Sequence, residues 1–252
     1  MSEFVKVERD GAVLVVTLAR PEKKNALTGA MYEKLIAAFV AASDDDAVGA
    51  LVIEGSGGVF CAGNDIGDFI AYAIAPGGAS QLPGMRFIYA LARFAKPLVA
   101  AVDGAAVGIG ATLCLHCDLV YASPNARFHM PFVDLGLAPE AGSSLLLPQR
   151  FGRARAAEYL MLCEPFDAET ARGGGLVNAV VDAAGLRAYA LDKARALAAK
   201  PRQALLATRR LLRGDEAALI ARMDDEAKAF VAALKSPEAR AAFMSFMSRA
   251  KG

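Results

Sequence analysis

Alternating apolar and polar positions near the N-terminus predict a β-hairpin followed by a helix. Residues 4–19 alternate around an Asp10-Gly11 turn, which is typical of two antiparallel strands. From Thr28, a suitable N-cap, apolar side chains recur at helical spacing until the acidic run at 44–46 ends the helix.

The remaining chain alternates between strand and helix patterns and then becomes helical. An apolar run at 49–55 predicts the next strand, and the alternation continues to about residue 181. From Ala183 onwards the pattern is nearly all helical, with breaks at Lys200-Pro201, Gly214 and Ser236-Pro237. This order predicts an α/β core over residues 1–195 and a C-terminal helical region over residues 196–252.

Composition narrows the class of protein. The 252 residues are 55% hydrophobic with a formal net charge of +1, which fits one large domain and lacks the basic excess of a nucleic-acid-binding protein. No apolar run is long enough to cross a membrane, and no secretory or peroxisomal signal is visible at the ends. We therefore expect a cytoplasmic protein with no nucleic-acid or membrane partner.

Cys114 and Cys117 have the spacing of a redox or metal pair. They lie in a mostly apolar stretch, and the sequence offers no second Cys or His pair to complete a metal site. Two buried core thiols are the favoured interpretation, and no metal is expected.

Two glycine-bearing turns carry the clearest chemical indication. FCAGNDI at 60–66 and DGAAVGIGAT at 103–112 each follow an apolar strand pattern and open into a helical pattern. Strand–turn–helix geometry leaves backbone N–H groups free at the start of the helix. Two such turns can direct two donors at one oxygen atom, which is the arrangement of an oxyanion hole.

Other interpretations of these turns are weaker. Gly108 and Gly110 resemble part of a dinucleotide-binding motif, but its third glycine is replaced by Leu113. Tight packing at a strand–helix turn remains possible for this segment. Asp65 and Asp68 are interpreted as charges that cap the first helical turn rather than as catalytic groups.

A third motif, LGLAPEAGSS at 135–144, places one glutamate among apolar residues. Desolvation there would raise the pKa of Glu140 towards the range of a general base. Without a partner motif, a surface-loop acid is the favoured interpretation. Gly142, Ser143 and Ser144 prepare the N-terminus of the apolar helix that follows.

Together with RPEKKNAL at 20–27, these motifs resemble the crotonase, or enoyl-CoA hydratase/isomerase, superfamily. The resemblance runs from about residue 4 to the C-terminus. It implies a ββα-superhelix core whose C-terminal helices cover the acyl site and pack subunits into trimers or dimers of trimers. It also implies an acyl-CoA thioester as substrate, with no separate cofactor because coenzyme A is part of that substrate.

The resemblance also assigns roles to individual residues. The backbone N–H groups of Asn64 and Ile109 correspond to the donors that hold the thioester oxygen. The expected residues for coenzyme A and substrate binding are Lys24, Ala26, Ala62, Asp65, Ile66, Gly110 and Phe132.

Departures from the family pattern indicate the chemistry. Hydratases of the family carry two glutamates, at positions that are Thr112 and Phe132 here, whereas Glu140 is retained. The motif around Glu140 resembles the Δ3,Δ2-enoyl-CoA isomerase branch, in which one carboxylate moves a proton without water. The alternatives are another crotonase reaction, including hydration, and a catalytically silent acyl-CoA-binding protein.

Two further segments stay open. Arg202, Arg209, Arg210 and Arg213 could meet coenzyme A phosphates or form a solvated face or a subunit contact. The Gly/Pro-rich segment 74–84 is expected to be a loop beside the acyl pocket.

Overall fold

The computed structural model describes residues 2–67 and 82–249. Among them, six strands form one sheet in the order β1-β2-β3-β4-β6-β9, with β1 and β2 antiparallel and all other pairs parallel. The strands are β1 (Val5–Asp10), β2 (Val13–Leu18), β3 (Ala50–Gly55), β4 (Leu98–Val102), β6 (Leu119–Ala122) and β9 (Ala179–Val180). The predicted N-terminal hairpin is confirmed.

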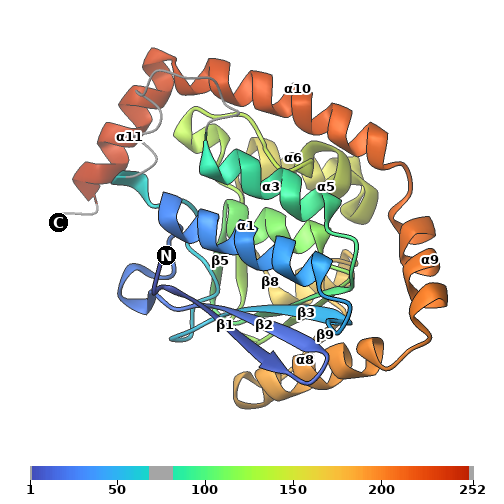
Figure 1. The fold of residues 1–252 in the computed structure, drawn as a ribbon. Helices are drawn as coiled ribbons and strands as arrows, with labels where there is room; N and C mark the ends of the chain where they lie inside the picture. The colour runs from blue at the N-terminus through green and yellow to red at the C-terminus, as the bar shows by residue number, and fades with distance from the viewer. Residues whose placement is uncertain (1, 68–81, 250–252) are drawn as a thin grey trace.

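Helices cover both faces of this sheet (Figure 1). Alternate residues such as Val16 and Ile53 face α1 (Gly29–Asp44) and α3 (Pro83–Arg93), and their neighbours pack against α8 (Ala183–Ala198). Every residue of β4 is buried. A parallel strand covered on two sides needs such a continuous apolar run.

Thr28 caps α1, as the sequence predicts. Its side chain accepts a hydrogen bond from the backbone N–H of Met31 at 3.3 Å. The acidic run ends the helix, because Asp44 is its last residue and Asp45 is extended. The hairpin and α1 thus precede β3 and the first glycine turn along the chain.

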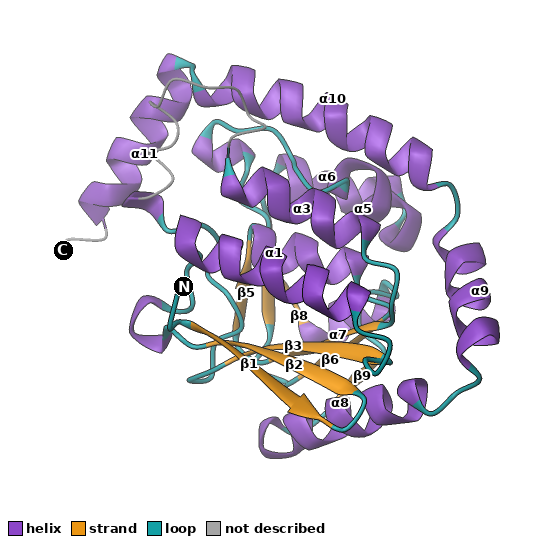
Figure 2. Ribbon diagram, in the orientation of Figure 1, coloured by secondary structure: helices purple, strands orange, loops and turns teal. Residues whose placement is uncertain are grey.

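A second, smaller sheet runs across the direction of the first (Figure 2). It consists of β5 (Ala105–Val107), β7 (Arg127–His129) and β8 (Phe166–Asp167). Strands of two or three residues carry no detectable period, so the sequence did not predict this sheet. Short helices lie between the strands along the chain: η1 (Pro21–Lys23), α4 (Ile109–Thr112), η3 (Leu113–His116), η4 (Val133–Leu135), α5 (Ser143–Phe151), α6 (Arg153–Met161) and α7 (Ala168–Gly173).

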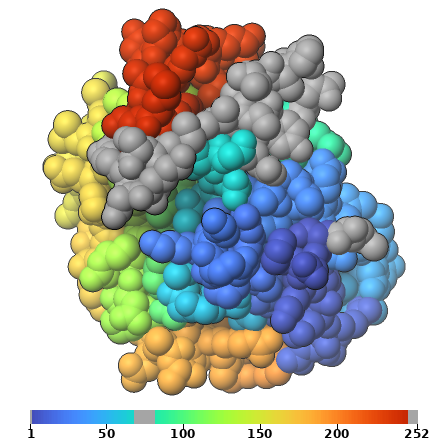
Figure 3. All heavy atoms as spheres, turned by 90° about the vertical axis from the view of Figure 1, so that its left-hand side faces the viewer, coloured from blue at the N-terminus to red at the C-terminus, as the bar shows by residue number. Residues whose placement is uncertain are grey.

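The C-terminal part is helical, with the breaks that the sequence predicts. It comprises α9 (Arg202–Arg213), α10 (Glu216–Leu234) and α11 (Pro237–Arg249). Figure 3 shows α11 at one end of the molecule and α8 at the opposite end. The expected boundary at 195/196 falls inside α8, whose side chains belong to the sheet packing; the division into domains stays a prediction.

In the two described ranges, no helix combines the length and apolarity needed to span a bilayer. Residues 74–81 of the expected loop lie outside the described residues, as does Asp68. Residues 83 and 84 of that segment begin α3.

Candidate active site

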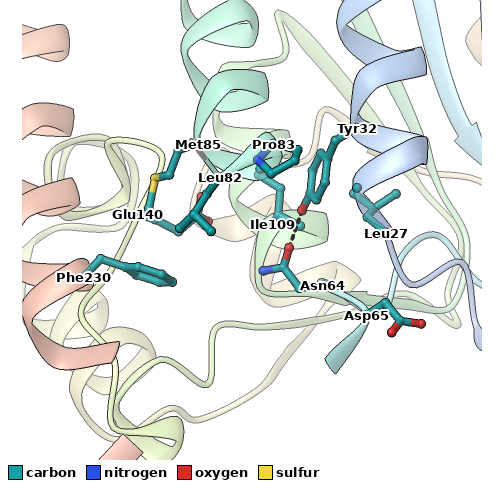
Figure 4. A pocket seen from close by; sticks show the side chains of 12 residues that line it. Leu27, Tyr32, Asn64, Asp65, Leu82, Pro83, Met85, Ile109, Glu140 and Phe230 are labelled. Atoms are coloured by element: carbon teal, nitrogen blue, oxygen red, sulfur yellow. Dashed lines mark hydrogen bonds between the residues drawn. The ribbon is translucent and has the colours of Figure 1, made fainter. Parts of the chain in front are cut away.

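A pocket lies where α1, α3, α4 and α10 meet the first glycine turn (Figure 4). It contains about 500 Å³ of unfilled space, part of which is open to solvent. Its lining is mostly apolar, with a few polar groups, which is typical of small-molecule sites. The lining residues are Leu27, Gly29, Tyr32, Asn64, Asp65, Leu82, Pro83, Gly84, Met85, Ile109, Glu140 and Phe230.

The two glycine turns lie side by side at this pocket. Cys61 forms a parallel bridge with Ala106, in which its N–H donates to Ala105 and its carbonyl accepts from Val107 at 2.8 Å. Gly110 allows this approach, because a Cβ at that position would lie 2.5 Å from the Cys61 carbonyl oxygen. The bridge brings Asn64 and Ile109, 45 residues apart in the chain, to one cavity.

The backbone hydrogen bonds around Asn64 and Ile109 do not use the N–H groups of these two residues. The neighbours of Asn64 form the bridge to Leu27, which donates to Gly63 at 2.8 Å and accepts from Asp65 at 2.9 Å. Ile109 is the first residue of α4, so its N–H has no acceptor within that helix. Within residues 2–67 and 82–249, neither N–H has a recorded backbone acceptor. The proposed role of these groups as an oxyanion hole is compatible with this arrangement.

Tyr32 fixes the side chain of Asn64. Its buried hydroxyl donates to Asn64 Oδ1 at 2.5 Å, and Figure 4 shows the amide nitrogen turned away from Tyr32. Burial also raises the pKa of Tyr32 well above its usual value, so the phenol stays protonated and can donate. Tyr32 was not predicted from the sequence, because its place among apolar residues at helical spacing indicates only a core position.

Glu140 reaches the pocket from the turn before α5. Its side chain is 8% exposed, and Thr112 donates a hydrogen bond to Oε1 at 2.5 Å. The pKa of Glu140 is raised to about 8, chiefly by burial; the Thr112 hydrogen bond opposes this shift, and the nearby Glu226 carboxylate adds a smaller increase. The structure therefore corrects the alternative of a surface-loop acid.

Thr112, which stands where hydratases of the family carry a glutamate, holds the Glu140 side chain by a hydrogen bond. It is fully buried on α4, three residues after Ile109, and its hydroxyl holds the Glu140 carboxylate. One short helix thus connects a candidate oxyanion donor to the candidate base. No local sequence pattern joins Thr112 to a residue 28 positions later.

The raised pKa of Glu140 predicts a pH dependence. A carboxylate base must be ionised, so kcat/KM is expected to rise with pH through a midpoint near 8. The folded-state pKa exceeds the unfolded value of about 4.5, so folding stability should fall as pH increases from about 4.5 to about 8. Rate profiles and thermal melts across this range test both expectations; a profile that is flat around pH 8 would contradict the first.

The segments expected to bind coenzyme A lie next to each other. Lys24 has a left-handed backbone with φ of 50°, and its carbonyl accepts from the Ala62 N–H at 2.9 Å. Asp65 lines the pocket, but its carboxylate pairs with Arg20 at 2.7 Å and accepts from the Gly67 N–H. This agrees with a capping rather than a catalytic role for Asp65.

The other expected binding residues lie outside the pocket lining given above, within the part of the chain described. These residues are Lys24, Ala26, Ala62, Ile66, Gly110 and Phe132. Phe132 is 5% exposed and belongs to the same core cluster as Met85 and Phe230, but only the latter two line the pocket. Coenzyme A binding by the first four stays a prediction.

The arginines of α9 mainly hold other elements of the chain. Arg209 is 7% exposed and bonds Asp118 and the Phe94 carbonyl, each at 2.7 Å. Arg213 bonds the Phe94 and Ala92 carbonyls, which end α3. Cations at a helix C-terminus stabilise its unpaired carbonyls. A solvated face is therefore wrong for these two residues, and neither lines the pocket.

The cysteine pair is confirmed as buried free thiols. Cys114 and Cys117 are 0% and 4% exposed, and burial raises the pKa of both. A thiol held in its protonated form is a poor nucleophile and a poor metal ligand. Across the described ranges, no group of three or more His, Cys, Asp or Glu residues could hold a metal ion.

Comparisons with known proteins show the family of this chain. The family model described as "Enoyl-CoA hydratase/isomerase" matches residues 8–252. The chain is 36% identical to rat "Enoyl-CoA delta isomerase 2" over 98% of its length, spanning 64% of that longer protein. It is 33% identical to Escherichia coli "2,3-dehydroadipyl-CoA hydratase", covering 99% of this chain and 97% of that protein.

A solved structure confirms the fold. Pseudomonas aeruginosa OdaA is 44% identical and superposes with a TM-score of 0.92, covering 98% of this chain and 99% of that one. The sheet order and helical cover described above are thus those of a crotonase-like α/β fold. The chain belongs to the enoyl-CoA hydratase/isomerase family of the crotonase superfamily.

Proposed function

We propose that this protein moves a double bond from C3 to C2 of an enoyl-CoA thioester, with Glu140 as the single acid and base. The observation that carries the proposal is the difference between the two carboxylates that line the pocket. Asp65 is held by Arg20, whereas Glu140 is buried with a pKa raised to about 8. Glu140 is therefore suited to take up a proton near neutral pH and release it again.

The reaction needs one proton to move between two carbon atoms. Glu140 takes the proton from C2, and the C–H electrons delocalise over the thioester and the C3–C4 double bond as a dienolate. The dienolate oxygen accepts hydrogen bonds from the N–H groups of Asn64 and Ile109. Glu140 then protonates C4, which leaves the double bond between C2 and C3.

Main-chain donors suit this charge because they are preorganised. Loss of one oxyanion donor costs about 2.7–4 kcal/mol in enzymes that use such sites. A positioned base contributes a further factor of about 10²–10⁴. An apolar lining of Leu82, Met85 and Phe230 would receive the acyl chain and keep water from the dienolate.

Isomerisation is favoured over hydration by the number of acids. Water addition needs one group to activate water and another to protonate carbon. Thr112 and Phe132 occupy the two positions at which hydratases of this family carry glutamates, and Thr112 uses its hydroxyl to hold Glu140. The acyl-CoA substrate, a trimeric or hexameric assembly and a cytoplasmic location are parts of the same proposal.

Product identification tests the proposal. Purified protein is incubated with 3-hexenoyl-CoA and, separately, with crotonyl-CoA. We expect 2-hexenoyl-CoA to form rapidly from the first substrate and little 3-hydroxybutyryl-CoA from the second. Fast hydration of crotonyl-CoA would identify a hydratase instead. Acyl-CoA binding without turnover of either substrate would identify a silent binding protein.

A further inference from the structure

Glu226 is a buried carboxylate on α10 with contacts that the proposed reaction does not explain. Glu226 is only 6% exposed. Its carboxylate accepts hydrogen bonds from two backbone N–H groups. The Gly142 N–H lies 2.6 Å from Oε2, and the Ser144 N–H lies 2.9 Å from Oε1. These N–H groups belong to the turn that follows Glu140 and starts α5.

This carboxylate replaces a local helix cap. Residue 142, the N-cap of α5, is a glycine with φ of 70°, and no side chain of its own caps the helix. The positive φ would strain a Ser or Asp at this position, and its Cβ would lie 2.5 Å from Leu219 Cδ1 of α10, so a local side-chain cap is disfavoured. The cap is therefore supplied by a residue 84 positions away, and it places a costly negative charge in the interior.

The turn held by Glu226 is strained and is fixed at a second point. Ala141 has φ of 59°, a left-handed conformation that is unfavourable for a residue with a Cβ. His116 Nε2 lies 2.7 Å from the Ala141 carbonyl oxygen, and burial lowers the pKa of His116 to about 4, so the ring is neutral. Two side chains from distant elements thus restrain the two residues that follow Glu140.

The same helix also lines the pocket. Phe230 lies one turn after Glu226 on α10, where residues four apart share a face. Displacement of α10 would therefore move an acyl-pocket wall and the turn of Glu140 together. Glu226 itself is absent from the lining residues given for the pocket, so its effect on the reaction is indirect, through the turn of Glu140 or through the position of α10.

We propose that Glu226 is a positioning residue: its carboxylate fixes the turn at Ala141 and Gly142, which aims Glu140 into the pocket. The inference rests on the proposed function, in which Glu140 is the base. A further consequence is electrostatic, because Glu226 is a like charge close to Glu140.

The groups around Glu226 leave its charge largely uncompensated by cations. Arg222 on α10 is the cation that lowers its pKa, and Ser144 on α5 donates to it, but burial outweighs both and raises the pKa. On α3, Tyr89 faces it and donates to Asp224 at 2.5 Å. Removing the Glu226 charge should therefore lower the pKa of Glu140.

Glu226→Gln tests the proposal, with Asp225→Asn as the matched control. Gln keeps the shape, but its NH₂ group faces a backbone N–H, so the turn loses one acceptor. A displacement of about 1 Å can cost about 100-fold, so we expect a loss of this order in kcat with little change in KM. Asp225 is the adjacent carboxylate, is exposed and pairs with Lys228, and its variant should match wild type.

The pH profile separates positioning from a merely structural role. In Glu226→Gln the rising limb of kcat/KM should shift to lower pH, whereas Glu226→Asp should lower kcat and keep the limb in place. Titration of the Glu140 carboxyl by NMR measures the same shift without any turnover. A wild-type kcat in Glu226→Gln would overturn the proposal. So would a loss of rate in both variants if the Glu140 titration in Glu226→Gln were unshifted.

A double variant distinguishes failure of this inference from failure of the proposed function. If Glu226 acts through Glu140, Glu226→Gln should cost almost nothing further in a Glu140→Gln background, because the two sites are coupled. Undiminished turnover in Glu140→Gln alone would refute the proposed function instead. If Glu226→Gln does not fold, kcat and the Glu140 titration are measured in Glu226→Asp instead.

Discussion

Glu140→Gln is expected to lower kcat for 3-enoyl-CoA isomerisation by about 10²–10⁴-fold, the usual contribution of a positioned base. Glutamine has nearly the same volume and its carbonyl can still accept the Thr112 hydrogen bond, which is 2.5 Å in the wild type. The geometry of the pocket is therefore preserved while the proton acceptor is lost. Rates with 3-hexenoyl-CoA and binding of a non-reactive acyl-CoA measure the two effects separately.

Stability provides an internal control for this variant. The buried Glu140 carboxylate has its pKa raised to about 8, so the ionised form destabilises the fold at alkaline pH. Glu140→Gln should melt at a higher temperature than wild type above pH 8 and retain acyl-CoA affinity. Turnover equal to that of wild type would show that another group is the base.

Gly110→Ala is expected to lower kcat by about 10²–10³-fold, as loss of one oxyanion donor does. The added Cβ would lie 2.5 Å from the Cys61 carbonyl oxygen and 2.8 Å from Cys61 Cβ. Because the obstructing group is backbone, α4 has to move away from the first turn. The Ile109 N–H would then no longer point to the same oxygen as the Asn64 N–H.

Two variants control for this result. Gly185→Ala adds a methyl group in α8 with nothing within 4 Å and should leave kcat unchanged. Asn64→Ala removes the side chain but keeps the backbone N–H, so it should cost much less than Gly110→Ala. Equal losses in Gly110→Ala and Asn64→Ala would indicate that the side-chain amide, rather than the main chain, stabilises the charge.

The elements that the sequence predicted are those with a local cause. The hairpin follows from alternation around Asp10-Gly11, and α1 begins at Thr28 because this side chain caps Met31. The helical breaks of the C-terminal region coincide with Pro and Gly positions. The second sheet was missed, since strands such as β8, with two residues, are stabilised only by their partners.

Site prediction divided in the same way. The motifs identified Asn64, Ile109 and Glu140 as candidates, and all three line one pocket. Tyr32 and Glu226 were missed because each acts on a residue far away in the chain. Phe132, expected from the resemblance among the substrate-binding residues, does not line this pocket, so its role stays a prediction.

The glycine turns, the family and the single glutamate after Pro139 could be recognised from the amino-acid sequence, because each depends on residue types at short spacing. Tertiary structure alone decided that Glu140 is buried with a raised pKa and that Thr112 holds its carboxylate. It also placed Glu226 of α10 against the start of α5. The physical reason is that burial and long-range hydrogen bonds depend on which surfaces meet after folding, and no local pattern contains that information.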